Sequence, residues 1–401
     1  MRVLLTANAS YVPPRGGATR SNLIWMDQMA RAGHQCRIVC GASGEGAELR
    51  FHSSIAVFDV EDPGRRIQVL RQQIREFQPD WVLVSSEDLG HGLLREAHHS
   101  AAGRVVYLAH TPQFFPFGPA SWNASKVDAE LVARSAGVVA IGHHMAGYIE
   151  RALDRSAVVI HPPIYGPGPF ANYGNPDRGL VTMVNPCAVK GLSIFLDAAM
   201  RMPDVEFGVV PGWGTTSADR RALEGLPNVR MLPIAPSIDD ILAPTRVLLM
   251  PSLWYEGFGL IVTESMLRGI PVLASDSGGL VEAKHGTGYV IPVRTIQRYE
   301  AVYDEHAMPR PVVPPNDPAP WIAALGELLG DREAYGRESV ASRTAARRFL
   351  ATLDAADMER YLSSLKQRSE AGPAHATIES LSPEKRALLL ERLRKRKGVP
   401  S

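Results

Sequence analysis

Short apolar runs that recur along the chain, with helix-like segments between them, constrain its fold more than any other feature. The runs are rich in Val, Ile and Leu and do not alternate with polar residues, which is typical of parallel strands buried on both faces. This repeated strand–helix–strand order predicts two doubly wound α/β domains. The runs of the first half are Val3–Leu5, Arg37–Cys40, Trp81–Val84, Val105–Leu108, Val138–Ile141 and Val158–Ile160, and those of the second half are Leu180–Val184, Glu206–Val210, Val229–Leu232, Val247–Met250, Pro271–Ala274 and Tyr289–Ile291.

A stretch rich in proline and glycine, His161–Pro169, separates the two halves and cannot continue a helix or a sheet. It predicts a hinge at 161–178 between an N-terminal domain over 1–165 and a C-terminal domain over 178–340. A second loop is expected at Met308–Pro315. The helices expected after it are Trp321–Leu329, Arg332–Leu353 and Ala356–Lys366.

Composition excludes several classes of protein. The 43 Lys and Arg residues nearly balance the 42 Asp and Glu residues, so charge gives no reason to expect nucleic-acid binding. The 3 cysteines are too few to form a disulfide framework in a chain of 401 residues. We see no secretory leader and no apolar stretch of membrane-spanning length. We therefore expect a cytoplasmic protein.

The most informative motif is Glu256-Gly-Phe-Gly-Leu-Ile-Val-Thr-Glu264. Its glycines allow the backbone to approach a ligand closely. A helix is expected at Leu260–Arg268, and its N-terminus offers unpaired N–H groups and the positive end of a dipole to a phosphate. Both carboxylates are placed to reach hydroxyls of a sugar nucleotide. The alternative is a capping acid followed by an exposed helical glutamate.

Two other segments are expected at the crevice where parallel strands end and ligands bind. Val184-Asn-Pro-Cys-Ala-Val-Lys-Gly191 follows the first strand of the second domain. Its Lys190 is placed to pair with a diphosphate as a point charge, or it is a solvated lysine before a helix. Gly16 and Gly17 precede a helix expected from about Ser21. This pair forms either a phosphate-compatible loop or an ordinary turn.

His110 follows the fourth strand of the first domain, where a polar side chain is aimed at the crevice. The alternative is a histidine with a purely structural role. The aromatic residues that follow it, Phe114, Phe115 and Phe117, belong either to the core or to the wall of an acceptor pocket.

Together, in this order and spacing, these segments resemble a retaining family 4 glycosyltransferase of the GT-B fold, in which two Rossmann-like domains face a central cleft. The resemblance covers about residues 1–365. The segment Glu256–Glu264 matches the E-x7-E motif of the family, and Gly278, Gly279 and Glu282 follow as in many members. The helices at 341–366 resemble the family's segment that crosses back to the N-terminal domain.

The resemblance implies a role for each matching residue. Glu256 is expected to contact the donor sugar, Glu264 the ribose diol, and Lys190 the leaving diphosphate. His110 is expected to point at the reaction centre. The remaining donor-binding residues implied in this way are Gly16, Gly17, Asn185, Gly257, Phe258, Gly259, Leu260 and, near the base, Leu232.

Asn185 marks a departure from the family pattern. Many members carry a Gly-Arg pair at this point, where this chain has Asn185-Pro186, which brings no charge. Binding of the diphosphate must then depend on Lys190, the helix N-terminus or a basic residue elsewhere, such as Arg15 or Arg20. No Asp-x-Asp stands in a loop placed to hold Mg²⁺, so we expect neither a metal nor a cofactor, only a nucleotide diphosphate sugar as co-substrate.

The segment 367–401 is expected to be a linker followed by a basic amphipathic tail. Leu381–Leu393 resembles a linker found beside domains of nonribosomal peptide and polyketide synthases. This implies docking of a synthase or carrier protein through 381–397 and a natural-product or carrier-bound acceptor. Peripheral membrane contact and a basic tail without a partner are the alternatives.

The sequence thus predicts an enzyme that transfers a sugar from a nucleotide sugar to a hydroxyl acceptor. A sugar-nucleotide epimerase on a similar fold is disfavoured by the E-x7-E segment and by Lys190-Gly191. A catalytically weak sugar-nucleotide-binding or scaffold module of a biosynthetic assembly line is the remaining alternative, and the absent arginine is its best support.

Overall fold

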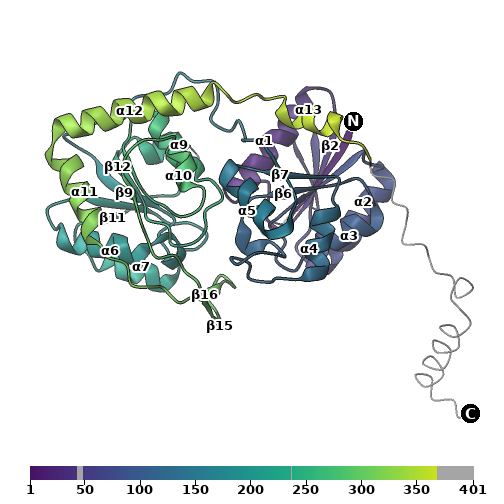
Figure 1. Cartoon of the computed structure of the whole chain (residues 1–401), viewed down its shortest axis with the longest axis horizontal. Coiled ribbons are helices and arrows are strands. Elements are labelled where there is room, and N and C mark those ends of the chain that lie inside the picture. The colour runs from purple at the N-terminus through teal and green to yellow at the C-terminus, as the bar shows by residue number, and fades with distance from the viewer. Residues whose placement is uncertain (43–47, 236, 368–401) are drawn as a thin grey trace, which may run out of the picture.

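The computed structural model describes residues 1–42, 48–235 and 237–367, and it consists of two α/β units that face each other (Figure 1). Each unit has a mostly parallel sheet between helices, as the continuous apolar runs predict. The expectation of two doubly wound domains is therefore confirmed. The predicted tail at 381–397 and the linker before it lie outside the described residues.

The N-terminal sheet has the strand order β3-β4-β2-β1-β5-β6-β7-β8. Its strands are β1 Arg2–Thr6, β2 Gln35–Cys40, β3 Leu49–His52, β4 Ile55–Asp59, β5 Trp81–Ser85, β6 Val105–Ala109, β7 Gly137–Ala140 and β8 Val158–Val159. The helices around it are α1 Gly17–Arg31, α2 Pro63–Phe77, α3 Gly92–Ser100, α4 Lys126–Arg134 and α5 His143–Leu153, with a single 3-10 turn, η1 Pro112–Phe114.

The strands β3 and β4 were not expected from the sequence. They pair antiparallel at one edge of the sheet, around a turn in which Ser53 has a φ of 52°. Every second residue of β4 is buried, so this strand alternates instead of forming a continuous apolar run. The antiparallel strand β3 therefore departs from the parallel strands that the apolar runs predict, whereas β4 is parallel to β2.

The C-terminal sheet has the strand order β11-β10-β9-β12-β13-β14 and is parallel throughout. Its strands are β9 Leu180–Val184, β10 Phe207–Val210, β11 Val229–Met231, β12 Thr245–Met250, β13 Val272–Ser275 and β14 Val290–Ile291. The helical elements are η2 Ala188–Lys190, α6 Leu192–Arg201, α7 Ser217–Glu224, α8 Ile238–Leu242, α9 Leu260–Leu267, α10 Leu280–Ala283, α11 Ala319–Gly330 and α12 Arg332–Leu350.

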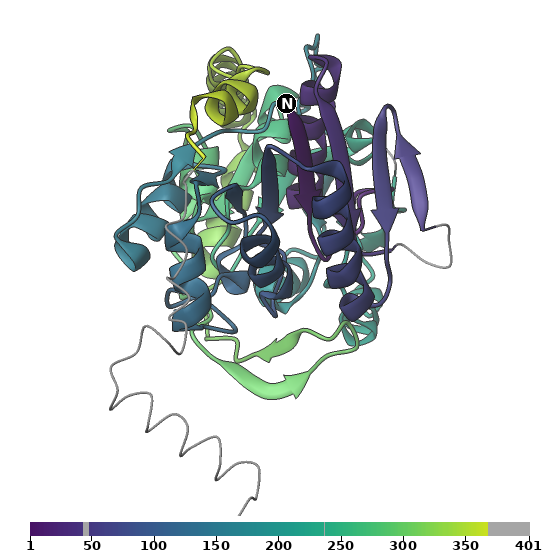
Figure 2. The same cartoon turned by 90° about the vertical axis from the view of Figure 1, so that its right-hand side faces the viewer.

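A two-stranded hairpin replaces part of the loop expected at Met308–Pro315. It consists of β15 Tyr299–Tyr303 and β16 Pro309–Pro311, and it projects from the C-terminal domain near the boundary with the N-terminal domain (Figures 1 and 2). At its base the Tyr299 ring packs edge-on against Trp122 of the N-terminal domain, with centroids 5.3 Å apart. At its tip Glu305 accepts hydrogen bonds from Ser217 at the start of α7.

The chain returns to the N-terminal domain only after α12. This helix packs on α9, whereas the following helix α13, Asp357–Ser364, packs on α1 (Figure 1). The Oε1 atom of Glu359 on α13 lies 2.8 Å from the Nε2 atom of His34, which lies between α1 and β2. One hydrophobic cluster spans both domains and includes Leu5 and Val139 from one, and Phe258 and Val262 from the other.

Candidate active site

Lys190 and Glu256 meet at the carboxyl edge of the C-terminal sheet. Lys190 ends the turn η2 after β9, Glu256 follows β12, and these strands are neighbours. The Lys190 Nζ atom lies 2.5 Å from the Glu256 Oε1 atom, and 4.7 Å from the centroid of the Trp254 ring. The Ser252 hydroxyl also donates to Glu256. Two of the three predicted catalytic groups, Lys190 and Glu256, are therefore adjacent, and each is largely shielded from solvent.

Glu264 lies on α9, directly after the glycine turn of the motif. Gly259, the residue before this helix, has a φ of 102°, a left-handed conformation that favours glycine. The Glu264 carboxylate is buried, and its Oε1 atom lies 2.9 Å from Nη2 of Arg20 on α1. The motif's second acid is therefore not an exposed helical glutamate. Arg20, considered above as a phosphate ligand, instead reaches it from the other domain.

His110 follows β6 and is buried, with 2% of its surface exposed. Its Nε2 atom lies 2.7 Å from the Asn22 Oδ1 atom of α1, and its backbone N–H donates to the Ser86 hydroxyl. The Nδ1 atom has no hydrogen-bond partner within the described residues. Burial lowers the pKa of His110 to about 3, so the imidazole is neutral near pH 7.

The domains touch where these residues converge. A Cβ atom on Gly257 would lie 2.2 Å from the backbone oxygen of His110, so only glycine allows this approach. On the same side, a Cβ atom on Gly17 would lie 3.2 Å from Leu260. The structure thus brings together the N-terminal glycine loop, His110 and the Glu256–Glu264 motif, as the resemblance implies.

Asn185 takes a left-handed conformation with a φ of 58° at the end of β9. Its Oδ1 atom accepts a 2.9 Å hydrogen bond from the Gly214 N–H, which holds the loop after β10. Its Nδ2 atom is buried. Asn185 therefore fixes this loop, and the two N–H donors of its Nδ2 atom have no partner among the described residues.

Leu232 and Phe258 stand apart from the polar groups. Leu232 follows β11 at the far edge of the sheet, and its backbone N–H donates to the Val209 oxygen. The Phe258 side chain is buried and stacks on Phe349 of α12. Only the backbone of Phe258 is thus suited to touch a donor.

A cavity of about 390 Å³ lies between the domains beside this site. Gln113 and Tyr148 line it from the N-terminal domain, and Tyr255 and Tyr299 line it from the C-terminal domain. Of the aromatic residues after His110, Phe115 and Phe117 belong to the core. Phe114 instead packs edge-on against Trp122.

Several residues of the site were missed in the sequence. They are Asn22, Ser252 and Trp254, which contact His110, Glu256 and Lys190 respectively. Ser252 and Trp254 lie between β12 and the motif, at the carboxyl end of a strand, and this position could have identified them as site residues. Asn22 gave none, because it lies on the inner face of a helix 88 residues from His110.

Two Rossmann-like α/β domains that face each other, with the candidate site between them, are the arrangement of the GT-B class of glycosyltransferases. Solved structures support the fold. Sucrose-phosphate synthase from Thermosynechococcus elongatus superposes with a TM-score of 0.70 at 15% identity, over 90% of this chain and 98% of that one. HepE from Anabaena, in complex with UDP and glucose, gives 0.64 at 19% identity, over 91% and 100%. WaaG, a glycosyltransferase involved in lipopolysaccharide biosynthesis, gives 0.60 at 14% identity, over 92% and 100%.

The family itself is shown by models of its two domains. Residues 15–165 match the model described as Glycosyltransferase Family 4, and residues 178–331 match the model described as Glycosyl transferases group 1. The chain therefore belongs to the family 4 glycosyltransferases, and it is an enzyme of the class that uses nucleotide sugars. No curated protein sequence matches it significantly. Among the described residues, no helix has the length and apolar character needed to cross a membrane.

Proposed function

We propose that this enzyme transfers a sugar, with retention of anomeric configuration, from a nucleotide diphosphate sugar to a hydroxyl of the acceptor. The observation that carries the proposal is the contact of Lys190 with Glu256, opposite the neutral His110 of the other domain. Such a transfer requires a cation beside the leaving group and, next to it, a carboxylate that contacts the sugar.

The donor is proposed to lie along the carboxyl edge of the C-terminal sheet. Its diphosphate would contact Lys190, the Nδ2 atom of Asn185, which has no partner among the described residues, and the backbone N–H groups of the turn before α9. The ribose would reach Glu264, and the base would lie near Leu232. HepE binds UDP and UDP-glucose, which makes the uridine donor the first to test here.

Departure of the nucleotide diphosphate requires that its developing negative charge be stabilised. Lys190 supplies this electrostatically from a shielded position, where a charge acts more strongly than in water. The bond between the anomeric carbon and the phosphate oxygen breaks as the acceptor hydroxyl attacks from the same face. That hydroxyl gives its proton to the departing phosphate oxygen, so the protein positions both partners and needs no strong base.

No metal is proposed in the donor site, because Lys190 and the N-terminus of α9 provide the positive potential there. His110 would act by contact with the donor sugar. As a neutral imidazole whose Nε2–H donates to the Asn22 Oδ1 atom, it can accept a hydrogen bond at Nδ1 without adding charge to the reaction centre.

The acceptor is proposed to approach through the cavity between the domains. Gln113 lies three residues after His110, and Tyr255 immediately precedes Glu256, so the cavity is next to both catalytic segments. Its tyrosine walls suit an acceptor with apolar faces and polar edges. A natural product, free or bound to a carrier, is the acceptor class that we propose from the tail sequence at 381–397.

The test is a panel of nucleotide diphosphates and their sugars, followed by transfer. We expect one donor to raise the thermal midpoint clearly, since ligand at a hundred times its Kd stabilises by about 2.7 kcal/mol. That donor should then release nucleotide diphosphate in the presence of an acceptor, and NMR of the product should show the anomeric configuration of the donor. Stabilisation without turnover would favour the binding-module alternative, and an inverted product would contradict the mechanism.

A further inference from the structure

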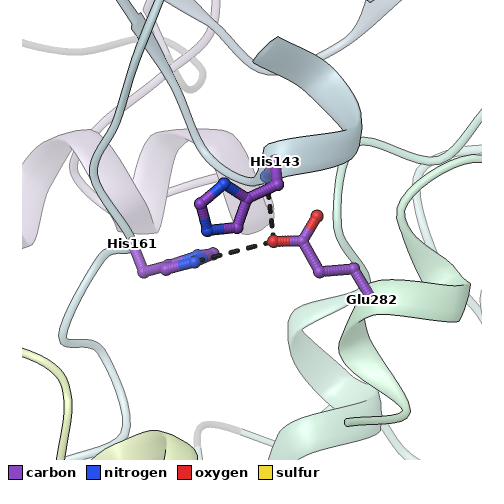
Figure 3. A group of neighbouring side chains, drawn as sticks. All are labelled: His143, His161 and Glu282. Atoms are coloured by element: carbon purple, nitrogen blue, oxygen red, sulfur yellow. Dashed lines mark hydrogen bonds and ion pairs between the residues drawn. The ribbon is translucent and has the colours of Figure 1, made fainter. Parts of the chain in front are cut away.

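Two imidazoles and one carboxylate converge at the junction of the domains, outside the donor-site residues described above (Figure 3). His143 begins α5 of the N-terminal domain, His161 lies in the hinge segment after β8, and Glu282 lies on α10 of the C-terminal domain. Each offers one ligand atom, and these atoms lie within 4.8 Å of one another. In the part of the chain that the structure describes, this is the one such group of three.

We propose that His143, His161 and Glu282 bind a zinc ion that holds the two domains together. Two histidine nitrogens and one carboxylate oxygen form a ligand set that zinc accepts, with a water molecule in the fourth position. Tetrahedral zinc places its ligand atoms about 3.4 Å apart. The His161 Nε2 and Glu282 Oε1 atoms are 3.6 Å apart, which is already close to this spacing.

Glu282 is held in place by the backbone of the opposite domain. Its Oε1 and Oε2 atoms accept 2.9 Å hydrogen bonds from the N–H groups of His143 and His144, at the N-terminus of α5. Each carboxylate oxygen retains a lone pair for a metal ion. Hydrogen bonds that orient a ligand in this way are typical of protein metal sites.

His161 is fixed by packing. Its ring lies 5.1 Å from the Phe258 ring and 5.0 Å from the Phe349 ring, between centroids. His143 is exposed, so its side chain can move by the roughly 1 Å that a tetrahedral arrangement requires. Two preset ligands and one adjustable ligand therefore surround the position.

The charges around the group favour a cation. His161 is within electrostatic reach of two carboxylates, Glu282 and Asp357 of α13, and of two other imidazoles, His143 and His285. The 3 cysteines, which would compete as softer ligands, are all buried elsewhere. Because Phe258 also belongs to the E-x7-E segment, zinc here would stabilise the contact of that segment with the hinge.

The test is calorimetric titration of zinc chloride into the full chain after treatment with a chelator. We expect one equivalent to bind to the native protein. His143→Ala removes one ligand and keeps the backbone N–H that donates to Glu282. This variant should therefore fold normally and bind zinc more than about 100-fold more weakly. His99→Ala, at an exposed histidine of α3, should bind as the native protein does. No binding, or equal binding by His143→Ala, would overturn the proposal.

Hydrogen exchange tests the link between the domains without reference to sugar transfer. Zinc should slow exchange at the start of α5 and in α10 together, in the native protein and not in His143→Ala. Binding that protects α5 alone would show that Glu282 is not a ligand and would overturn the inference. A protein that binds zinc and transfers no sugar would leave it intact, so the proposed function and this site fail separately.

Discussion

Lys190 and Glu256 form an ion pair with 2.5 Å between Nζ and Oε1, although 66 residues separate them in the chain. The pair is possible because β9 and β12 are neighbours, so that the turns after both strands lie at one edge. A diphosphate in the proposed site would compete with Glu256 for Lys190. The pair therefore sets the position of the lysine before a donor arrives.

Replacement of Lys190 tests this role. Lys190→Met keeps the length of the side chain and removes the charge, so stabilisation of the leaving group is lost. We expect kcat to fall about 100-fold or more, since a single electrostatic donor to a transition state has that effect. The matched control is Lys126→Met, at an exposed lysine that begins α4, and should be unchanged. Steady-state kinetics with the donor found in the panel would measure it, and equal rates for both variants would contradict the role.

The two acids of the motif should respond differently to truncation. Glu256→Ala removes the proposed contact to the donor sugar, so it should reduce transfer about 100-fold. It should not weaken affinity for nucleotide diphosphate, because it also frees Lys190 from its ion pair. Glu264→Ala removes the contact to the ribose and should weaken nucleotide binding about tenfold or more, as expected for a hydrogen bond to a charged group. Calorimetry with the nucleotide diphosphate and the transfer rate measure these effects separately.

The control for both acids is Glu224→Ala, at an exposed glutamate that ends α7. The same loss of nucleotide affinity in Glu256→Ala and Glu264→Ala would contradict the two roles. A loss of nucleotide affinity in Glu224→Ala would show that the assay responds to general damage to the protein.

Much of this fold could be predicted from continuous apolar runs, because a parallel strand that is buried on both faces is apolar along its whole length. The edge strand β3 and its neighbour β4 could not be found by the same rule, since β4 alternates and β3 is half exposed. The hairpin of β15 and β16 was missed for a related reason: its prolines indicated a loop, and prolines are tolerated at strand edges.

The site was predictable as a set of segments and not as a set of contacts. Parallel strands end at one edge, so Lys190 and Glu256 could be placed there from the sequence. The ion pair of Arg20 with Glu264 spans 244 residues and depends on how the two domains dock. No local pattern encodes that docking, and the same holds for His161 beside Glu282.

Gly257 provides a test of domain closure. Gly257→Ala would place a methyl group 2.2 Å from the His110 backbone oxygen, and a backbone atom cannot yield as a flexible side chain can. We expect the domains to separate and transfer to fall about 100-fold, since a misplacement of about 1 Å at a reaction centre has that effect. Small-angle scattering should show a larger radius of gyration. Gly326→Ala, in open space on α11, is the control, and an unchanged radius in Gly257→Ala would refute the contact.

Gly16 tests the N-terminal loop in the opposite way. No atom lies within 4 Å of the position of a Cβ on Gly16, and its φ of −172° is extended backbone that any residue adopts. The structure should therefore accept Gly16→Ala with a loss of stability of about 1 kcal/mol or less, the usual effect of alanine at a helix N-cap. If a substrate approaches this backbone as proposed, KM should rise while the thermal midpoint changes little. An unchanged KM would remove Gly16 from the donor site.

Buried histidines predict how stability depends on pH. Burial lowers the pKa of His110 to about 3, and those of His98 and His285 to about 4, from an ordinary value of 6.5. Below pH 6.5 the unfolded chain binds protons that the folded chain does not. Stability is therefore complete above pH 6.5 and is lost as pH falls toward 4, by up to about 1.4 kcal/mol per pH unit for each histidine.

His98 isolates this effect, because it lies on α3 outside the catalytic residues and its neighbour His99 is exposed. Glu87 acts in the opposite sense, since burial raises its pKa to about 7 and stability from this group falls as pH rises toward that value. Variants of His98 and His99 both retain Glu87, so its contribution cancels when they are compared. Urea unfolding between pH 5 and pH 8 should show a shallower pH dependence for His98→Gln than for His99→Gln. Equal slopes would mean that His98 takes up its proton in the folded chain as readily as in the unfolded one, and that its burial does not exclude the charged form.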